Sequence, residues 1–557
     1  MRGIKMKTKL IIVIISIFFI NLSFAQRPVY EWIRTANGTS WDEASAVACD
    51  NYGNSISTGY FDGSFNIGDS TFNTGIYSDI FLIKHDSNGN LIWAKQLACE
   101  RGAFGESVCL DDSGNSFLAG TFVDSICINN VMYYGYSTQA GFVTKFDQYG
   151  NVLWFHSFGG ENGWVWPTDL MALNNGDIVC TGMIGGTVTI GDSIFSTQTE
   201  ISFLVHYSSS GDFLNVTDVC ECSNQLETLG IASDGMDNIF IGGNFRGTLS
   251  FSDTSITSAG YDDIFIAKFD NQDNIIWARQ EGDIYSDIGL DVTADPQGNS
   301  AITGYFPGSI TIGDTTLTSL GLEDIFIIKY DPDGNVSWVR QAGGNVYYAL
   351  DEAYGIKADD DGNFYLAGHF EGSSYFGDTT LVSSGMTDIF CTKYDSAGNC
   401  IWAAKAGGSD EEWGADIALN NQGDIFLSGW YASSFTFGDT LITNTDATDV
   451  YVIKLTESEI NSINKRPNYP FQYKLYQNYP NPFNPSTKIR FTISKSEKVR
   501  IEVFNLLGQK IETLINKQMP TGLHEIDYNV TELSSGIYLY RIKAGEFQEV
   551  RKMILLK

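Results

Sequence analysis

Short apolar runs that alternate with polar residues dominate the chain, and polar turn residues bound each run. Examples are Ser107–Asp111, Ser300–Tyr305, Asp324–Lys329 and Ile489–Ile493. Successive side chains of a β-strand point to opposite faces, so these runs predict strands. No segment carries a convincing helical spacing. The pattern therefore predicts an all-β protein.

A tryptophan phrase recurs at a spacing of 61 to 64 residues. It stands at Trp32, Trp93, Trp154, Trp277, Trp338 and Trp402, and Asn215 occupies the place of the missing member. Each repeat contains an inner segment, a second segment, a Gly-Asp hairpin, a third segment and the Trp segment. Such self-similarity indicates a repeat architecture, and here it predicts seven four-stranded units.

Asp-x-x-Gly-Asn turns separate the segments, as at Asp86–Asn90 and Asp331–Asn335. Glycine supplies the positive φ, while Asp and Asn bond to nearby backbone, so each turn predicts a hairpin. The last unit stops near Lys454 without a Trp strand, whereas Val29–Arg34 is a Trp strand without a unit before it. We therefore expect a seven-bladed β-propeller, residues 26–455, closed by the N-terminal strand. A β-solenoid is the alternative architecture.

The repeats resemble the SBBP-type β-propeller repeats of bacterial surface proteins over about residues 29–455. The resemblance is carried by Gly298-Asn299, Ile302–Gly304, Asp324–Lys329 and the Trp338–Gly344 phrase. It implies surface display and no single reaction.

Beyond residue 455 the repeat stops, and residues 456–473 form an expected linker. Residues 474–557 return to period-two strands, which predicts a small Ig-like β-sandwich. This module resembles the type A sorting domain of the type IX secretion system. The matching positions are Tyr479, Pro480, Asn481, Pro482, Phe483, Asn484, Pro485, Gly508, Gly522, Gly536 and Tyr538. The resemblance implies contact with the secretion machinery, removal of the module by a sorting peptidase, and release or surface attachment.

The N-terminus has the layout of a secretory signal peptide, residues 1–25. Basic residues precede the apolar run Leu10–Ile20, and Ser23–Ala25 forms the expected cleavage site. Translation starts at Met1 or Met6. No other apolar run is long enough for a permanent membrane anchor. We expect a secreted or surface-displayed protein that passes through the periplasm.

Charge is distributed unevenly along the chain. The formal net charge is −33, and residues 26–464 alone hold 59 acidic and 15 basic residues, or −44. Such a field repels nucleic acid and anionic lipid and favours small cations. We therefore expect no nucleic-acid partner. The nine cysteines are an odd number, and we interpret most of them as small buried hydrophobic residues.

No known catalytic motif occurs, so we predict no catalytic residue, no metal site and no cofactor, with calcium as a candidate cation. Acidic residues gather before most inner segments, where a propeller places the entrance of its central channel. Trp164, Trp166, Trp413 and Trp430 depart from the repeat and are candidates for ligand stacking. The candidate ligand or cation face comprises Asp42, Glu43, Trp164, Trp166, Glu227, Asp287, Asp351, Glu352 and Glu412.

Three functions fit these observations. The first is a surface protein that binds a glycan or another protein. The second is a secreted polysaccharide hydrolase or lyase that uses two channel carboxylates. The third is a structural adhesion component. The sequence favours binding, because candidate aromatic residues are present and catalytic motifs are not.

Overall fold

The computed structural model describes residues 28–111, 113–346, 349–444 and 447–457, and most of 473–556. The signal peptide and nearly all of the expected linker lie outside the described residues. The chain divides into two compact units, Met1–Ser458 and Glu459–Lys557. All regular elements in the described residues are strands, which confirms the all-β prediction. No described segment is a helix long and apolar enough to cross a membrane.

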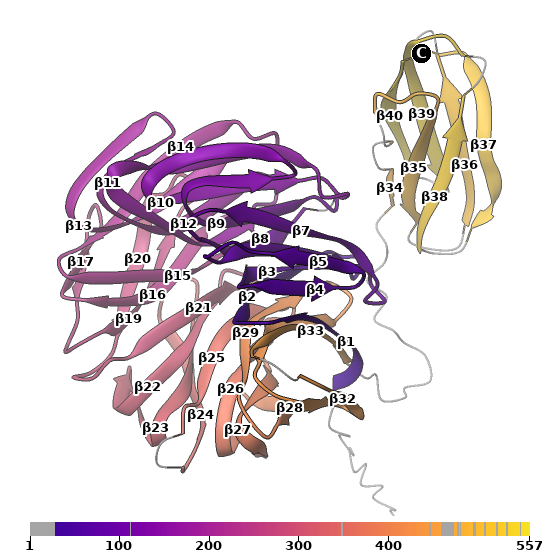
Figure 1. Ribbon diagram of the computed structural model, residues 1–557. Coiled ribbons are helices and arrows are strands. Elements are labelled where there is room, and N and C mark those ends of the chain that lie inside the picture. The colour runs from indigo at the N-terminus through magenta and orange to yellow at the C-terminus, as the bar shows by residue number, and fades with distance from the viewer. Residues whose placement is uncertain are drawn as a thin grey trace, which may run out of the picture. The chain divides into compact units, whose positions relative to one another are not determined.

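The larger unit consists of seven four-stranded antiparallel units arranged around a central axis (Figure 1). We number them 1 to 7 by their inner strands. The inner strands are β2 (Asp42–Cys49), β8 (Ala103–Leu110), the second half of β11 (Val152–Ala172), β15 (Gln225–Ser233), β21 (Ile288–Ala294), β25 (Glu352–Ala358) and β29 (Glu412–Leu419). Each inner strand contacts the next one, and β29 contacts β2.

The outer three strands follow in chain order, except that the fourth strand of unit 7 comes from the N-terminus. The second strands are β3 (Ser55–Phe61), β9 (Ser116–Ile128), β12 (Ile178–Ile190), β16 (Ile239–Arg246), β22 (Ser300–Ile312), β26 (Phe364–Phe376) and β30 (Asp424–Tyr431). The third strands are β6 (Asp79–His85), β10 (Val131–Phe146), β13 (Ser193–Tyr207), β19 (Asp263–Phe269), β23 (Thr315–Tyr330), β27 (Thr379–Tyr394) and β33 (Asp449–Glu457). The fourth strands are β7 (Leu91–Cys99), the first half of β11, β14 (Phe213–Cys222), β20 (Ile275–Glu281), β24 (Val336–Gly344), β28 (Cys400–Gly408) and β1 (Pro28–Gly38).

Strand β1 supplies the fourth strand of unit 7, as the sequence predicts. It pairs antiparallel with β33, with Trp32 opposite Lys454 and Ala36 opposite Val450, and in Figure 1 the indigo β1 lies beside the orange β33. Its last residues, Asn37 and Gly38, pair with β4 (Ser64–Ile67) of unit 1. The N-terminal strand therefore joins the last unit to the first.

A hairpin arm connects the second and third strands of every unit. In three units it is a separate pair of short strands: β4 with β5 (Ser70–Asn73), β17 (Thr248–Ser250) with β18 (Ser255–Thr257), and β31 (Phe435–Phe437) with β32 (Thr440–Ile442). Elsewhere the arm is formed by the adjoining ends of the two long strands. Six of the seven described arms pair with the fourth strand of the preceding unit. The arms thus link neighbouring units by backbone hydrogen bonds.

The recurring tryptophan packs on the outer turn of the next unit. The Trp277 indole N–H donates to Pro332 O at 3.1 Å, and Arg279 Nε donates to Gly334 O at 2.7 Å. Gly334 has a φ of 77°, and a Cβ there would stand 2.7 Å from the Trp277 ring. The turn glycine is required by both its φ and this close approach.

In unit 3 the tryptophan is missing, and the glycine of the facing turn is missing as well. Asn215 replaces the tryptophan, and the turn of the next unit carries Asp273, with φ 62°, in place of glycine. Asn215 Nδ2 donates to Asp273 Oδ2 at 3.0 Å, and His206 Nε2 lies 3.0 Å from Asp273 Oδ1. A polar contact thus replaces the ring-on-glycine contact where the ring is missing.

The cysteines serve as packing residues. All nine are described, and none forms a disulfide: Cys99, Cys180, Cys220, Cys222 and Cys391 are buried, and the other four are half-buried. The interpretation of most of them as small hydrophobic residues agrees with this placement.

The C-terminal unit contains two sheets. One is formed by β34 (Lys474–Leu475), β35 (Ser486–Ile493) and β38 (Gly522–Asn529). The other is formed by β37 (Lys510–Met519), β36 (Glu497–Phe504), β39 (Gly536–Ala544) and β40 (Phe547–Leu555). Alternating residues of both sheets, such as Ile489, Phe491, Val499 and Ile501, share one buried core.

The predicted sorting residues lie at the ends of these strands. Asn481 Oδ1 accepts from Ile554 N at 2.7 Å, and Phe483 is buried beside β40. Gly508, with φ 77°, closes a turn by donating to Asn505 O at 2.9 Å. Gly522 and Gly536 begin β38 and β39, and the Tyr538 hydroxyl donates to Ser534 O. Tyr479 and Pro480 lie outside the described residues. Pro482, Asn484 and Pro485 are in the segment before β35.

The packing of the recurring tryptophan predicts a large stability difference between two tryptophans. Trp277 is 7% exposed, whereas Trp41 is 56% exposed. We expect Trp277→Ala to lower the free energy of unfolding by about 3–5 kcal/mol and Trp41→Ala by less than about 1 kcal/mol. Calorimetry or urea unfolding of the two variants measures this. Equal losses would contradict the assignment of Trp277 to the contact between units.

Candidate functional site

The seven inner strands line a central channel with a volume of about 400 Å³. Every inner strand carries a β-bulge, because its pairing with the second strand slips by one residue at the same place. A bulge re-aims the side chains around it. The extra residues face the channel: Ser45, Glu106, Thr168, Leu229, Leu290, Tyr354 and Ala415.

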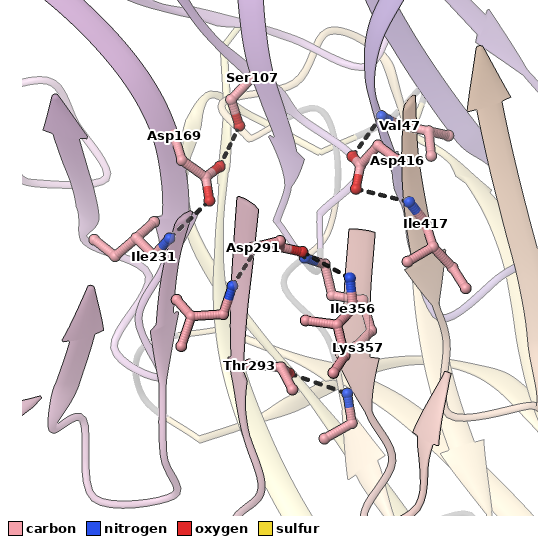
Figure 2. A network of polar contacts seen from close by, with 12 residues as sticks. Val47, Ser107, Asp169, Ile231, Asp291, Thr293, Ile356, Lys357, Asp416 and Ile417 are labelled. Carbon is pink, nitrogen blue, oxygen red and sulfur yellow. Dashed lines mark hydrogen bonds and ion pairs between the residues drawn. The ribbon is translucent and has the colours of Figure 1, made fainter. Parts of the chain in front are cut away.

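Three aspartates follow the bulge in alternate units and connect each of these units to the next. Asp169, Asp291 and Asp416 accept the backbone amides of Ile231, Ile356 and Val47 at 2.8–2.9 Å. Each one also accepts the amide of the residue that follows it. Figure 2 shows these carboxylates reaching across to the neighbouring strands. The aspartates therefore fix the inner strands of units 3 and 4, 5 and 6, and 7 and 1.

The residue after the bulge in the other units is small: Ala46, Ser107, Gly230 and Gly355. A Cβ on Gly230 would lie 2.8 Å from Asp291 Oδ1, and one on Gly355 would lie 2.9 Å from Ile417 N. Ser107 instead donates its hydroxyl to Asp169 at 2.6 Å. These small residues allow the neighbouring aspartate strand to approach closely.

Asp169, Asp291 and Asp416 are the channel aspartates, and Lys357 supplies the positive charge that opposes theirs. Its Nζ lies 2.9 Å from Asp291 Oδ2. Burial raises the pKa of Asp169 to about 6 and that of Asp416 to about 7, although the lysine charge acts in the opposite direction. Burial lowers the pKa of Lys357, but Asp291, Asp416 and Asp169 outweigh this effect and raise it above the ordinary value. The channel carboxylates therefore have a structural partner within the protein.

A second ring of side chains lies where the inner strands begin. Its members stand three residues before Asp169, Asp291 and Asp416, and three residues before the equivalent position in the other four units. We call them the mouth residues: Glu43, Phe104, Trp166, Glu227, Ile288, Glu352 and Trp413. Their cross-strand neighbours are Tyr60, Thr121, Met183, Asn244, Tyr305, His369 and Trp430. Three carboxylates, three aromatic rings and one isoleucine thus surround the channel entrance.

The mouth carboxylates are held by hydrogen bonds to neighbouring side chains. Tyr60 hydrogen-bonds to Glu43, and Asn244 Nδ2 donates to Glu227 at 3.2 Å. Trp166 hydrogen-bonds to the channel residue Glu106, whose pKa burial raises to about 7. Each acid therefore has a polar or aromatic neighbour in place of a basic one.

Units 5 to 7 form the most elaborate part of the mouth. Glu323 and Glu352 share a hydrogen bond, and Tyr354 also bonds to Glu352. Burial, followed by the charges of Glu323 and Asp351, raises the pKa of Glu352 to about 7. The His369 ring centre lies 4.0 Å from the Trp413 ring centre. We call Tyr305, Glu323, Glu352, Tyr354, His369, Trp413 and Trp430 the acidic–aromatic cluster.

The predicted site residues fall into two groups in the structure, because adjacent residues of a strand face opposite ways. Glu43, Trp166, Glu227 and Glu352 are mouth residues, and Trp164 lies two residues before Trp166 on β11. Asp42, Asp287, Asp351 and Glu412 are buried in joints between units, and the mouth residue Glu352 is also buried, at 6% exposed. Predicted residues from the first, third, fourth and sixth units are thus brought together at the mouth, whereas the other four acids are not part of an open ligand face.

The buried acids occupy joints between consecutive units, and we call them the joint carboxyls. Each lies near the first aspartate of the preceding third strand: Asp42 with Asp449, Asp287 with Asp263, Asp351 with Asp324, and Glu412 with Asp388. They accept backbone amides, for example Gly344 N to Asp351 at 2.8 Å and Gly408 N to Glu412 at 2.7 Å. Units 3 and 4 carry Val165 and Leu226 at this position.

Sequence reasoning missed Asp169, Asp291, Asp416, Lys357 and Glu323. The three aspartates stand at one repeat position in alternate units, and a residue-by-residue alignment of the repeats could have found them. No described group of three or more His, Cys, Asp or Glu side chains is arranged to hold a metal ion.

Comparison with known proteins identifies the C-terminal unit. Residues 477–556 match a family model described as a secretion system C-terminal sorting domain. The protein is therefore exported by the type IX secretion system, to the cell surface or into the medium, and it interacts with that system during export.

The chain has curated relatives at low identity. An uncharacterised WD repeat-containing protein of Acanthamoeba polyphaga mimivirus is 23% identical over 66% of this chain and 31% of its own length. A regulatory protein, FlaEY, of Caulobacter vibrioides is 28% identical over 20% of this chain and 12% of its own length. The chain thus spans about a third and about an eighth of these relatives.

Solved structures give only weak similarities. PorZ, a surface component of the type IX secretion system of Porphyromonas gingivalis, has 9% identity and a TM-score of 0.25, with 94% of this chain and 100% of PorZ covered. An arabinoxylan arabinofuranohydrolase of Bacillus subtilis has 10% identity and a TM-score of 0.28, with 92% and 95% covered. These TM-scores are too low to support a conclusion about fold or function.

The joint carboxyls predict that stability falls as the pH rises. Burial raises the pKa of Glu412 to about 8 from an ordinary value of 4.5, so the folded chain binds this proton more tightly than the unfolded chain. Its contribution is fully present below about pH 4.5 and is lost by about pH 8. We expect Glu412→Gln to raise Tm by a few degrees at about pH 8 and to have little effect near pH 5. Exposed Asp439→Asn is the control, and thermal unfolding against pH is the measurement. If the difference in Tm between Glu412→Gln and the wild type is the same at every pH, Glu412 does not hold this proton.

Proposed function

We propose that residues 26–455 form a seven-bladed β-propeller of the SBBP-repeat type that binds a glycan at its channel mouth on the outside of the cell. The seven units would be the blades, and β1 would close the ring. The C-terminal Ig-like sandwich, residues 474–557, would be the sorting domain that a sorting peptidase removes. Residues 1–25 would be the signal peptide and residues 456–473 the linker.

The observation that carries this proposal is the grouping of carboxylates and aromatic rings around the channel entrance. Glycans are bound by stacking of sugar faces on aromatic rings together with hydrogen bonds from hydroxyl groups to polar side chains. Trp413 stacks on Trp430 at 5.3 Å, and Trp41, which is 56% exposed, lies 6.4 Å from Trp430. This row of rings extends from the mouth toward solvent beside Glu352.

A hydrolase has less support from the geometry. Glycoside hydrolysis needs two carboxyl groups about 5–10 Å apart, so that a sugar or water fits between them. Glu323 and Glu352 are hydrogen-bonded to each other instead. Asp169, Asp291 and Asp416 bind backbone amides of adjacent units, which favours a structural role for them.

A glycan array tests the binding proposal on the mature full-length chain. We expect binding to one glycan class, and we expect Trp413→Ala and Trp166→Ala each to weaken it about tenfold, since one stacked ring contributes about 1–1.5 kcal/mol. Tyr149→Ala is the matched control, because Tyr149 is an exposed aromatic in an Asp-x-x-Gly-Asn turn at the opposite ends of the strands. No bound glycan, or equal losses in all three variants, would contradict the proposal.

Deletion of residues 476–557 tests the role of the C-terminal unit. We expect the shortened protein to accumulate in the periplasm, because the address read by the secretion system is missing. Surface labelling and cell fractionation measure this, with full-length protein as the control. Surface display of the shortened chain at the wild-type level would contradict the sorting role.

A further inference from the structure

The acidic–aromatic cluster contains carboxyl groups that lack a basic partner. Glu323 and Glu352 are hydrogen-bonded to each other. Among the described residues, the one ion-pair contact of either group is His369 Nε2, 3.9 Å from Glu352 Oε2. Burial lowers the pKa of His369 to about 3, so this imidazole is neutral at physiological pH. A hydrogen bond between two carboxyl groups requires one proton, so the pair carries a single negative charge while it shares that proton, and no described basic side chain compensates this charge.

Several other carboxylates of the larger unit have basic partners, and joint carboxyls such as Asp287 and Asp351 accept backbone amides instead. Asp291 has Lys357 at 2.9 Å, Asp388 has Lys405 at 2.6 Å, and Asp262 has Arg246 at 2.6 Å. In the cluster, tyrosines and tryptophans take the place of these basic residues. The difference indicates that a cation from outside the chain completes the cluster.

The neutral histidine is a second sign of an incomplete site. His369 is fully buried, and neither ring nitrogen has a hydrogen-bond partner in the described structure. Its Nε2 faces Glu352, and its ring lies against Trp413. A buried polar group without a partner is costly, and it is commonly satisfied by a ligand or an ordered water.

Aromatic rings around the pair determine which cation fits. Tyr354 bonds to Glu352 and lies 6.2 Å from the Trp413 ring. Tyr305 lies among Glu352, Glu323 and Glu227, whose charges, together with burial, raise its pKa. Ammonium groups are recognised by aromatic faces together with carboxylates, whereas a hard metal ion prefers oxygen ligands alone.

We propose that the Glu323–Glu352 pair, with Tyr305, Tyr354 and Trp413 around it, binds a primary ammonium group of the ligand. The glycan would then be one that carries free amino sugars. This inference rests on the proposed glycan-binding function and adds the chemical class of the ligand. The acidic body, with its charge of −44, would also attract such a ligand.

Two tetrasaccharides that differ only in charge test the inference. The β-1,4-linked glucosamine tetramer carries free ammonium groups, and the N-acetylglucosamine tetramer has the same rings without charge. Isothermal titration of the mature full-length chain at physiological salt measures both affinities. We expect the charged tetramer to bind at least about tenfold more tightly, which corresponds to about 1.4 kcal/mol.

Glutamine variants assign this preference to the pair. Glu323→Gln and Glu352→Gln each remove a carboxylate at nearly constant size, and we expect each to reduce the preference to less than about threefold. Glu31→Gln, which removes an exposed carboxylate on the outer strand β1, should leave the preference unchanged. If Glu352→Gln fails to fold, as judged by Tm, the result for Glu323→Gln decides, because Glu323 is only half-buried.

Three results would overturn the inference. Equal binding of both tetramers would leave glycan binding in place but exclude an ammonium site. A preference that persists in both glutamine variants would assign it to the general acidic field. Binding of neither tetramer would exclude amino sugars, and the glycan array would then decide independently on the proposed function.

Discussion

The pairing of β1 with β33 is the constraint on which the arrangement of the seven units depends. The strand completes unit 7 by pairing with β33 and then continues to pair with β4 of unit 1. Without it, β33 would expose an unpaired edge, and the contact of β29 with β2 would lose its outer support. All seven inner strands line the channel, and this junction lies where the last unit meets the first.

Neighbouring units are connected at several distances from the axis, and each connection depends on a particular pair of residue types. At the outside, a tryptophan requires a glycine turn, and Asn215 is matched by Asp273 instead. Near the axis, an aspartate after the bulge requires a small residue in the adjacent unit. Asp291, for example, approaches Gly230 so closely that a Cβ there would clash with it. These paired requirements explain why the repeats deviate from their consensus in a coordinated way.

The sequence predicted most of the fold because strand periodicity, Gly-Asn turns and the Trp spacing are local signals. It also predicted that Trp32 lies in the last sheet, from the imbalance between the two ends of the repeat region. The site was harder to predict. Asp351 and Glu352 are adjacent buried acids, yet Asp351 lies in a joint and Glu352 lies on the mouth side of the strand, and only the strand register separates them. The bulge that aims Tyr354 into the channel has no sequence signal of its own.

Function in this molecule depends on what the inner strands present at the channel entrance, whereas the carboxylates deeper in the channel hold the units together. This division depends on a continuous ring of units. The pairing of β1 with β33 is therefore the feature that tests it most directly. Hydrogen–deuterium exchange of the mature chain measures it, since paired strand amides exchange only on opening of the structure. Our account predicts that the amides of residues 32–36 exchange as slowly as those of residues 450–454. Exchange of residues 32–36 at the rate of exposed loops, with residues 450–454 still protected, would contradict it.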